Sequence, residues 1–270
     1  MSDGMRLLII RTVLVATDLE PSSRDALETA HRLATLAGAS LHAVHVMAPA
    51  RAGGSETARG KAVEDVRAAL RGAGVAEEHA TVHVGPGAPA EAIRALADRI
   101  SADVVVIGPH RRRAGITGEQ ALGSTARRIV ERAYAPCLIV GQQLRLPLRR
   151  VLVPTDFSET ASGALLVGLS WASGLRTRDE ADGATTLTAL HVDAATGEAS
   201  RASPASLLED ELEELRREGG SWAGVTMHGV TEQGEQPAET IERFAVRHRS
   251  DVVVIGTRGA GTLEDSRLGS

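Results

Sequence analysis

The sequence has few aromatic residues and a single cysteine, and both shortages exclude classes of protein. Only 2% of its 270 residues are aromatic, which argues against the stacking platforms of proteins that bind single-stranded nucleic acid. One cysteine, Cys137, allows neither an internal disulfide nor a cysteine-rich metal site. Because Cys137 opens an apolar run, we expect a small buried hydrophobe rather than a reactive thiol.

Long apolar runs and an excess of positive charge are also missing. Nothing in the sequence approaches the ~20 apolar residues of a membrane span, and the apolar run 7–10 is too short for a signal peptide. The formal net charge of -5 leaves no electrostatic footprint for DNA or RNA. We therefore expect a cytoplasmic protein that binds neither nucleic acid nor a membrane.

The most informative feature present is a long internal repeat. The matched segments are 13–18 and 151–156, His45-Val46 and His191-Val192, 103–108 and 251–256, and Gly123-Ser124 and Gly269-Ser270. Their offsets of 138 to 148 residues far exceed a solenoid repeat of about 20–50 residues. The sequence therefore predicts a duplicated domain, and each half is long enough to bury its own core.

Within each half, short runs rich in Val and Ile alternate with amphipathic helical patterns. The first half predicts strands at 9–16, 40–47, 80–84, 103–107 and 137–141, and helices at 22–37, 57–72, 89–100 and 123–134. The second predicts strands at 149–154, 185–192, 224–230 and 251–255, and helices at 160–174, 205–218 and 237–248. Strands that are apolar throughout, alternating with helices, indicate a parallel sheet covered on both faces.

We therefore predict two tandem doubly wound α/β domains, at 1–141 and 149–270. Ser22 or Ser23 can cap the first helix and Gly38 can end it. The sequence stops at Ser270, the counterpart of Ser124, so we expect the second domain to be without the last helix and strand of the first, either because the chain is cut there or because the protein naturally lacks them. Its fourth strand is then expected to form an open edge, which favours instability, self-association or a helper chain.

Candidate functional residues follow the predicted strands at one end of each sheet. Asp18 and Asp156 follow the first strand of each half, and Gly108 and Gly256 follow the fourth. Doubly wound sheets bind ligands outside the carboxyl ends of their strands, where the winding reverses. Glycines let backbone amides approach an anion, and a Gly-Ser pair that opens a helix adds a hydroxyl and unpaired amides. The aspartates could accept hydrogen bonds from a ribose or an adenine amino group. They could instead cap the following helix or bond turn amides.

Over essentially all of both halves, the chain resembles a tandem member of the universal stress protein family. The family's nucleotide motif is Gly, two residues, Gly, nine residues and Gly-Ser/Thr. The matching residues are Gly256, Gly259, Gly269 and Ser270. The resemblance implies a sheet of strand order 3-2-1-4-5, ATP or AMP as the ligand with Mg²⁺ as an optional companion, and two domains packed as an internal pseudo-dimer, with a homodimer as a further option.

The resemblance also assigns roles in the second half. Pro154, Asp156 and Val192 would contact the adenosine, and the motif glycines with Ser270 would contact phosphates and ribose. In the first half, the residues kept are Asp18, Val46, Gly108, Gly123 and Ser124. There Arg111 replaces the second glycine, and eleven residues instead of nine separate it from Gly123. We therefore expect a reshaped first-half cradle, with nucleotide bound mainly by a second half whose terminus is complete.

The histidines predict no metal site. His42 and His45 are three apart on a strand and so point to opposite faces, and His79 and His83 lie too far apart to chelate an ion. His45 and His191 recur at a strand end, where we expect them to be packed or bonded to the backbone.

Three classes of function stay open at this point. The first is a nucleotide-binding stress or signalling protein without efficient catalysis, and the second is a scaffold that binds no nucleotide. The third is a weak ATPase, for which the sequence offers no catalytic constellation. A related pyrophosphatase would need a Ser-Gly-Gly-x-Asp-Ser loop after its first strand, and residues 17–20 are unlike it.

Overall fold

The computed structural model describes residues 9–47, 56–108, 123–132, 135–176, 184–193, 203–218, 222 and 224–257. Contacts divide the chain into two compact units. The first half is Ile10–Leu144, and the second half is Arg145–Ser270 together with Met1–Ile9.

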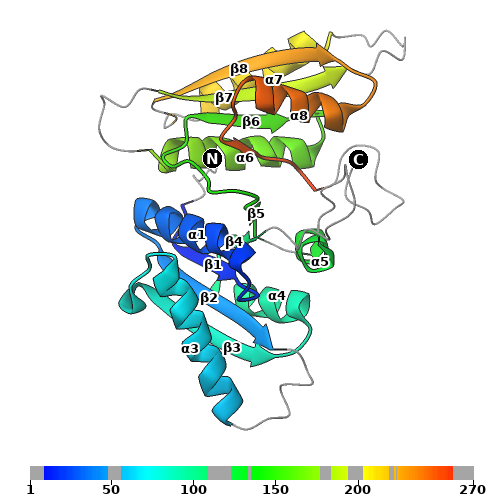
Figure 1. The fold of residues 1–270 in the computed structure, drawn as a ribbon. Helices are drawn as coiled ribbons and strands as arrows, with labels where there is room; N and C mark the ends of the chain where they lie inside the picture. The colour runs from blue at the N-terminus through cyan, green and yellow to red at the C-terminus, as the bar shows by residue number, and fades with distance from the viewer. Residues whose placement is uncertain are drawn as a thin grey trace. The chain divides into compact units, whose positions relative to one another are not determined.

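The first half contains a parallel sheet of five strands in the order β3-β2-β1-β4-β5, which confirms the predicted order (Figure 1). The strands are β1 (Thr12–Ala16), β2 (Ser40–Met47), β3 (Ala80–Pro86), β4 (Val104–Ile107) and β5 (Cys137–Ile139). The helices are η1 (Pro21–Ser23), α1 (Arg24–Ala37), α3 (Glu56–Gly72), η2 (Glu77–His79), α4 (Pro89–Ile100) and α5 (Ser124–Arg132).

The central strand β1 shows why the runs are apolar throughout. Val13, Leu14 and Val15 are all fully buried, because helices cover both faces of the sheet. Leu14 belongs to a core cluster that includes Ile93 of α4 and Ile129 of α5. The helices α4 and α5 therefore cover one face of the sheet.

The second half repeats this plan with four strands in its described part, in the order β8-β7-β6-β9. The strands are β6 (Arg150–Pro154), β7 (Thr185–Asp193), β8 (Val225–Gln233) and β9 (Val252–Val253). The helices are α6 (Glu159–Gly174), α7 (Pro204–Glu218) and α8 (Pro237–Arg247). Strand β9 is shorter than the predicted 251–255, and on its outer side no strand within the described part of the chain supports it.

The repeated aspartates before β4 and β9 hold the starts of the central strands. Asp103 Oδ2 accepts hydrogen bonds from the Arg11 and Thr12 amides at 2.8 and 2.9 Å. Asp251 Oδ2 accepts from the Arg149 and Arg150 amides, both at 2.8 Å. This structural role explains why an aspartate occurs at the same position in both halves.

Helix α1 ends as the sequence predicts but begins differently. Gly38 adopts a left-handed conformation with φ of 65° at its C-terminus. At its N-terminus a 3₁₀ turn, Pro21–Ser23, precedes it. Ser23 occupies the N-cap position, one of the two positions that the sequence predicts, but its side chain makes no capping hydrogen bond.

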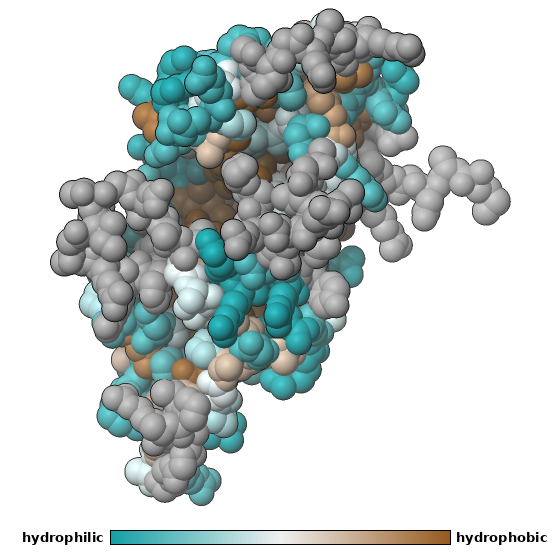
Figure 2. Space-filling model, turned by 90° about the vertical axis from the view of Figure 1, so that its right-hand side faces the viewer, coloured by the Kyte–Doolittle hydropathy of each residue, from teal (hydrophilic) through white to brown (hydrophobic). Residues whose placement is uncertain are grey.

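Hydrophilic residues cover much of the described surface on the face shown in Figure 2. The exposed large hydrophobic residues are Ile9, Ile139, Leu207, Val246 and Ile255. No helix in the described ranges has the length and apolarity needed to cross a bilayer.

Candidate functional site

A hydrogen-bonded turn after β1 fixes the carboxylate of Asp18. Its Oδ1 accepts the Glu20 amide at 3.0 Å and the Ser23 hydroxyl at 2.5 Å. Thr17 Oγ1 accepts the Leu19 amide at 3.0 Å, and Leu19 adopts a positive φ of 66°, which non-glycine residues do seldom. The predicted alternative role of Asp18, bonding turn amides, is thereby confirmed. Ser23 is used for this turn instead of capping α1.

His45 of β2 is hydrogen-bonded to the same turn. Its Nδ1 lies 3.0 Å from the Thr17 carbonyl oxygen. Because a carbonyl only accepts hydrogen bonds, Nδ1 carries the hydrogen. In the second half, His191 makes the same bond to Thr155 at 2.9 Å. Both histidines are therefore bonded to the backbone, as the sequence predicts.

The second half rebuilds this turn after β6. Asp156 Oδ1 accepts the Ser158 amide at 3.0 Å, and Thr155 Oγ1 accepts the Phe157 amide at 3.0 Å. Phe157 repeats the positive φ, at 63°. Here Ser158 caps α6 directly, because its hydroxyl accepts the Ala161 amide at 3.3 Å.

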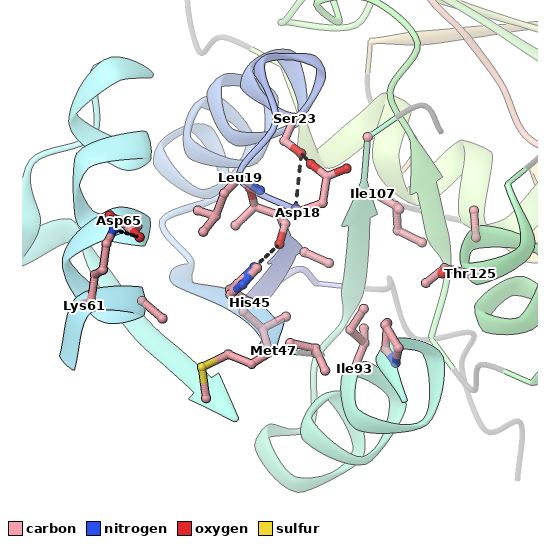
Figure 3. A pocket seen from close by; sticks show the side chains of 18 of the residues that line it. Asp18, Leu19, Ser23, His45, Met47, Lys61, Asp65, Ile93, Ile107 and Thr125 are labelled. Carbon is pink, nitrogen blue, oxygen red and sulfur yellow. Dashed lines mark hydrogen bonds and ion pairs between the residues drawn. The ribbon is translucent and has the colours of Figure 1, made fainter. Parts of the chain in front are cut away.

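The first half encloses a cavity of about 830 Å³ at the carboxyl ends of its strands (Figure 3). Its walls are largely apolar, with Val44 and Val46 from β2, Ile107 from β4 and Ile93 from α4. Pockets that bind small molecules commonly have this size and this mixture of apolar walls and a few polar groups. The cavity of the first half is therefore large enough for a molecule of nucleotide size.

The polar groups of the cavity lie at three places, on α3, on α5 and at the ends of the central strands. Asp18 and His45 stand at the end of the central strands, and Lys61 and Asp65 come from α3. In Figure 3 the α3 pair lies on one side, Thr125 of α5 on the other, and Asp18 with His45 between them. Asp18 Oδ2 accepts no hydrogen bond from the described residues, since both bonds of this carboxylate reach Oδ1. That oxygen is available to a ligand.

Three of the five predicted first-half residues line this cavity, namely Asp18, Val46 and Gly108. Gly123 and Ser124 do not line it but stand at the start of α5, directly before the lining residues Thr125 and Ala126. An added Cβ at Gly108 would lie 3.4 Å from the Ser22 carbonyl oxygen. The glycine thus also allows close packing of η1 on the end of β4.

The predicted second-half residues are only partly described. Pro154 ends β6, Val192 lies in β7, and Asp156 is exposed in the turn. Gly256 follows β9, and an added Cβ there would stand 2.7 Å from the Thr160 carbonyl oxygen. The close approach of α6 therefore explains the glycine at this position. Gly259, Gly269 and Ser270 lie outside the described residues, and the motif they complete stays a prediction.

Sequence reasoning missed the Ser23, Lys61 and Asp65 side chains of this site. Ser23 follows Asp18 by five residues, a spacing that an ordinary turn also has, so the sequence carries little signal for it. Lys61 and Asp65 have the spacing of an exposed helical ion pair, with Nζ–Oδ2 at 2.8 Å. Nothing in that pattern shows that α3 forms a wall of the cavity.

A pair of histidines that the sequence did not predict joins β2 to β3. His42 Nδ1 and His83 Nε2 are 2.9 Å apart, and their rings stack with centroids 5.2 Å apart. Burial lowers the pKa of both residues, and electrostatic interactions with His42 and then Arg99 lower the pKa of His83 further. His79 lies before β3, in η2, and stacks on His31. Within the described ranges no group of three or more possible metal ligands occurs.

The lone cysteine behaves as the sequence predicts. Cys137 is partly buried in β5 and packs against the core cluster that includes residues of α4 and α5. Burial raises the pKa of its thiol to about 11. The thiolate is therefore scarce at neutral pH, which fits a packing role.

Comparison with known proteins matches both halves to one family. The family model described as the universal stress protein family matches residues 10–141 and again residues 147–270. A universal stress protein from Archaeoglobus fulgidus is 19% identical with a TM-score of 0.66, over 93% of this chain and 89% of that one. A functionally unknown protein from Pseudomonas aeruginosa is 16% identical with a TM-score of 0.61, over 97% of this chain and 87% of that one.

A shorter solved structure matches about half of the chain. It is a universal stress protein from Archaeoglobus fulgidus in complex with dAMP, 22% identical with a TM-score of 0.38, over 49% of this chain and 99% of that one. Comparison with curated proteins finds no match. The two longer similarities establish the fold of both halves.

Proposed function

Since the chain belongs to the universal stress protein family, we propose that its first half binds an adenine nucleotide, AMP or ATP, in the cavity beside Asp18. The observation that carries this proposal is a carboxylate with one oxygen fixed by its own turn and the other free at the rim of a cavity of nucleotide size. The function is then to sense or signal nucleotide in a stress response.

The shape and lining of the cavity suit an adenosine. The apolar side chains of Val46, Ile93 and Ile107 offer surfaces against which a flat purine ring loses its contact with water. Asp18 Oδ2 can accept a hydrogen bond from the adenine amino group or a ribose hydroxyl. A carboxylate acceptor strengthens such a bond relative to a neutral one.

The polar groups of the cavity favour binding over efficient catalysis. Asp18 Oδ1 and His45 Nδ1 are already engaged in the turn, so neither atom is free to move a proton. We therefore propose slow hydrolysis at most. A multiple-turnover assay with ATP, with and without Mg²⁺, tests this, and rapid turnover would point to the ATPase class instead.

The binding proposal is tested by calorimetric titration of AMP and of ATP into the full chain and two matched variants. Asp18→Asn keeps an oxygen for the turn but replaces the free acceptor with an amide donor. We expect its affinity for AMP to fall about tenfold or more, the loss of one hydrogen bond to a charged group. Asp156→Asn makes the same change in the second half and is expected to leave first-half binding unchanged.

Three outcomes of that titration separate the alternatives. Equal AMP affinity in Asp18→Asn and the parent chain contradicts the assignment of Asp18. Loss of binding in Asp156→Asn alone moves the site to the second half, where the glycine motif predicts it. No binding by the parent chain favours the scaffold, for which the predicted pseudo-dimer of the two halves would be the functional form.

A further inference from the structure

Lys61 and Asp65 form an ion pair on α3, at one side of the cavity. Both side chains belong to the same helix, so the pair does not join α3 to another element. We infer that Lys61 is a specificity-determining residue, which binds the phosphate of the nucleotide and leaves Asp65 to do so. This inference rests on the proposed function. It names the group that makes the first-half cavity prefer a nucleotide over a nucleoside.

Charge is the first argument. Among the described residues that line the cavity, Lys61 is the only lysine or arginine, whereas Asp18 and Asp65 both supply carboxylates. A phosphate placed there without Lys61 would face two negative groups, which costs free energy in a partly enclosed site. Lys61 is therefore the described side chain able to offset the charge of an anionic ligand.

The weakness of the existing pair is the second argument. Lys61 Nζ lies 3.0 and 2.8 Å from the two oxygens of Asp65, but the side chains are 75% and 44% exposed. Exposed pairs stabilise a protein little. The basic residue also precedes the acidic one by four positions, which is the less favourable order on a helix. A ligand phosphate can thus take the ammonium at small cost.

Comparison of the halves gives the third argument. With the offset that relates His45 to His191, Ala62 and Val66 of α3 match Leu208 and Leu212 of α7, and all four are buried. The same offset places Leu207 at the position of Lys61 and Glu211 at that of Asp65. Glu211 accepts the Ser162 hydroxyl at 2.6 Å and so joins α7 to α6.

The lysine therefore stands in the half that lacks the second glycine of the phosphate motif. Arg111 occupies that glycine's position in the first half, while the second half keeps Gly259 and has Leu207 on its helix. A cation from α3 supplies phosphate affinity where the ring of backbone amides is altered. The first half thus combines a changed sequence in the phosphate motif with a charged side chain from α3 at the cavity.

The test compares AMP with adenosine, titrated calorimetrically into the full chain and its variants. Lys61→Leu installs the residue of the second half. We expect its AMP affinity to fall about tenfold, the lower end for a hydrogen bond to a charged group, with adenosine affinity unchanged. Arg94→Leu breaks the Arg94–Asp98 pair of α4 (3.3 Å), which lies outside the cavity lining, and should change neither affinity.

A second variant moves the affinity in the opposite direction. Asp65→Asn removes the competitor of the phosphate, and we expect AMP affinity to rise about two- to threefold, in line with the strength of an exposed pair. Equal losses for AMP and adenosine in Lys61→Leu, or unchanged AMP affinity, overturn the inference while the proposed function stands. Failure of the parent chain to bind either ligand overturns the proposed function itself.

Discussion

The two halves build the same turn from Thr-Asp but attach the next helix to it in different ways. In the first half, the Ser23 hydroxyl donates to Asp18, and the 3₁₀ turn Pro21–Ser23 intervenes before α1. In the second half, Ala161 stands at the position of Ser23, and Ser158 caps α6 at once. The two halves therefore share the strand and the turn but use serine differently. In the first half a serine bonds the aspartate, and in the second half a serine at another position caps the helix.

This difference bears on function because the Ser23 hydroxyl helps to hold Asp18 in the first half. Asp18 Oδ1 receives both an amide and a hydroxyl, so the orientation of its carboxylate is fixed by two bonds. Pre-orientation of a polar group lowers the entropy lost when a ligand binds. The Ser23 hydroxyl thus helps to orient the carboxylate of the first half, although the glycine motif of that half is the less regular one.

The largest difference between the halves should come from their matched glycines. In Gly256→Ala the new Cβ meets Thr160 backbone atoms at 2.7 and 2.8 Å, whereas in Gly108→Ala the nearest contact is 3.4 Å. We expect Gly256→Ala to destabilise the packing of α6 by about 2 kcal/mol, as overpacking does, and Gly108→Ala to cost well under half of that. Hydrogen exchange of the α6 and α1 amides in the full chain measures both, and equal costs would contradict this packing account.

Removing the helix cap should have the next largest effect. In Ser158→Ala, the Ala161 amide loses its acceptor, and we expect α6 to be destabilised by about 1 kcal/mol. In Ser23→Ala, no helix amide loses a cap, so α1 should keep its protection while the Asp18 carboxylate loosens. Exchange rates of the first-turn amides of α6 and α1 distinguish the two, and a comparable loss in α1 would show that Ser23 does cap it.

The smallest expected effect is a pH dependence that only the first half should show. The pKa values of His42 and His83 are lowered in the fold, so below the ordinary value of 6.5 the unfolded chain binds more protons. Stability is therefore full above this pH and is lost as the pH falls through the lowered pKa values. The matched positions on β7 and β8 are Thr188 and Val230, which do not titrate.

Hydrogen exchange between pH 7.5 and 5.5, corrected for intrinsic rates, checks this prediction. The β2 and β3 amides should lose protection on acidification, and His83→Gln should reduce that loss. The β7 and β8 amides of the same chain serve as the internal control. Uniform loss in both halves would attribute the effect to general acid destabilisation.

The sequence predicted those parts of the molecule that depend on local pattern. The apolar runs around Val13 and Val151 identified the central strands, and their order along the chain fixed the sheet topology through the family resemblance. The cross-strand pair of His42 and His83 could not be predicted, because the register of β2 against β3 is set by packing of the whole sheet. The position of Lys61 at the cavity likewise depends on where α3 packs.

The sequence predicted a nucleotide site mainly in the second half, whereas the cavity that supports our proposal lies in the first half. The glycine motif pointed to the second half, and three of its residues lie outside the described part of the chain. The cavity found in the first half rests on apolar residues such as Ile93 and Ile107, which read as ordinary core positions in the sequence. A glycine motif in the sequence indicates a loop whose backbone can bind phosphate. A cavity, in contrast, depends on side chains from elements that are far apart in the sequence.

The most direct measurement is an NMR titration of the full chain, labelled at isoleucine methyl groups, with AMP. The duplication provides matched probes, because Ile93 and Ile107 of the cavity correspond to Ile241 and Ile255 of the second half. Our account predicts saturable shifts of the Ile93 and Ile107 signals at AMP concentrations that fill the site. Shifts confined to Ile241 and Ile255, or no shifts at all, would contradict it.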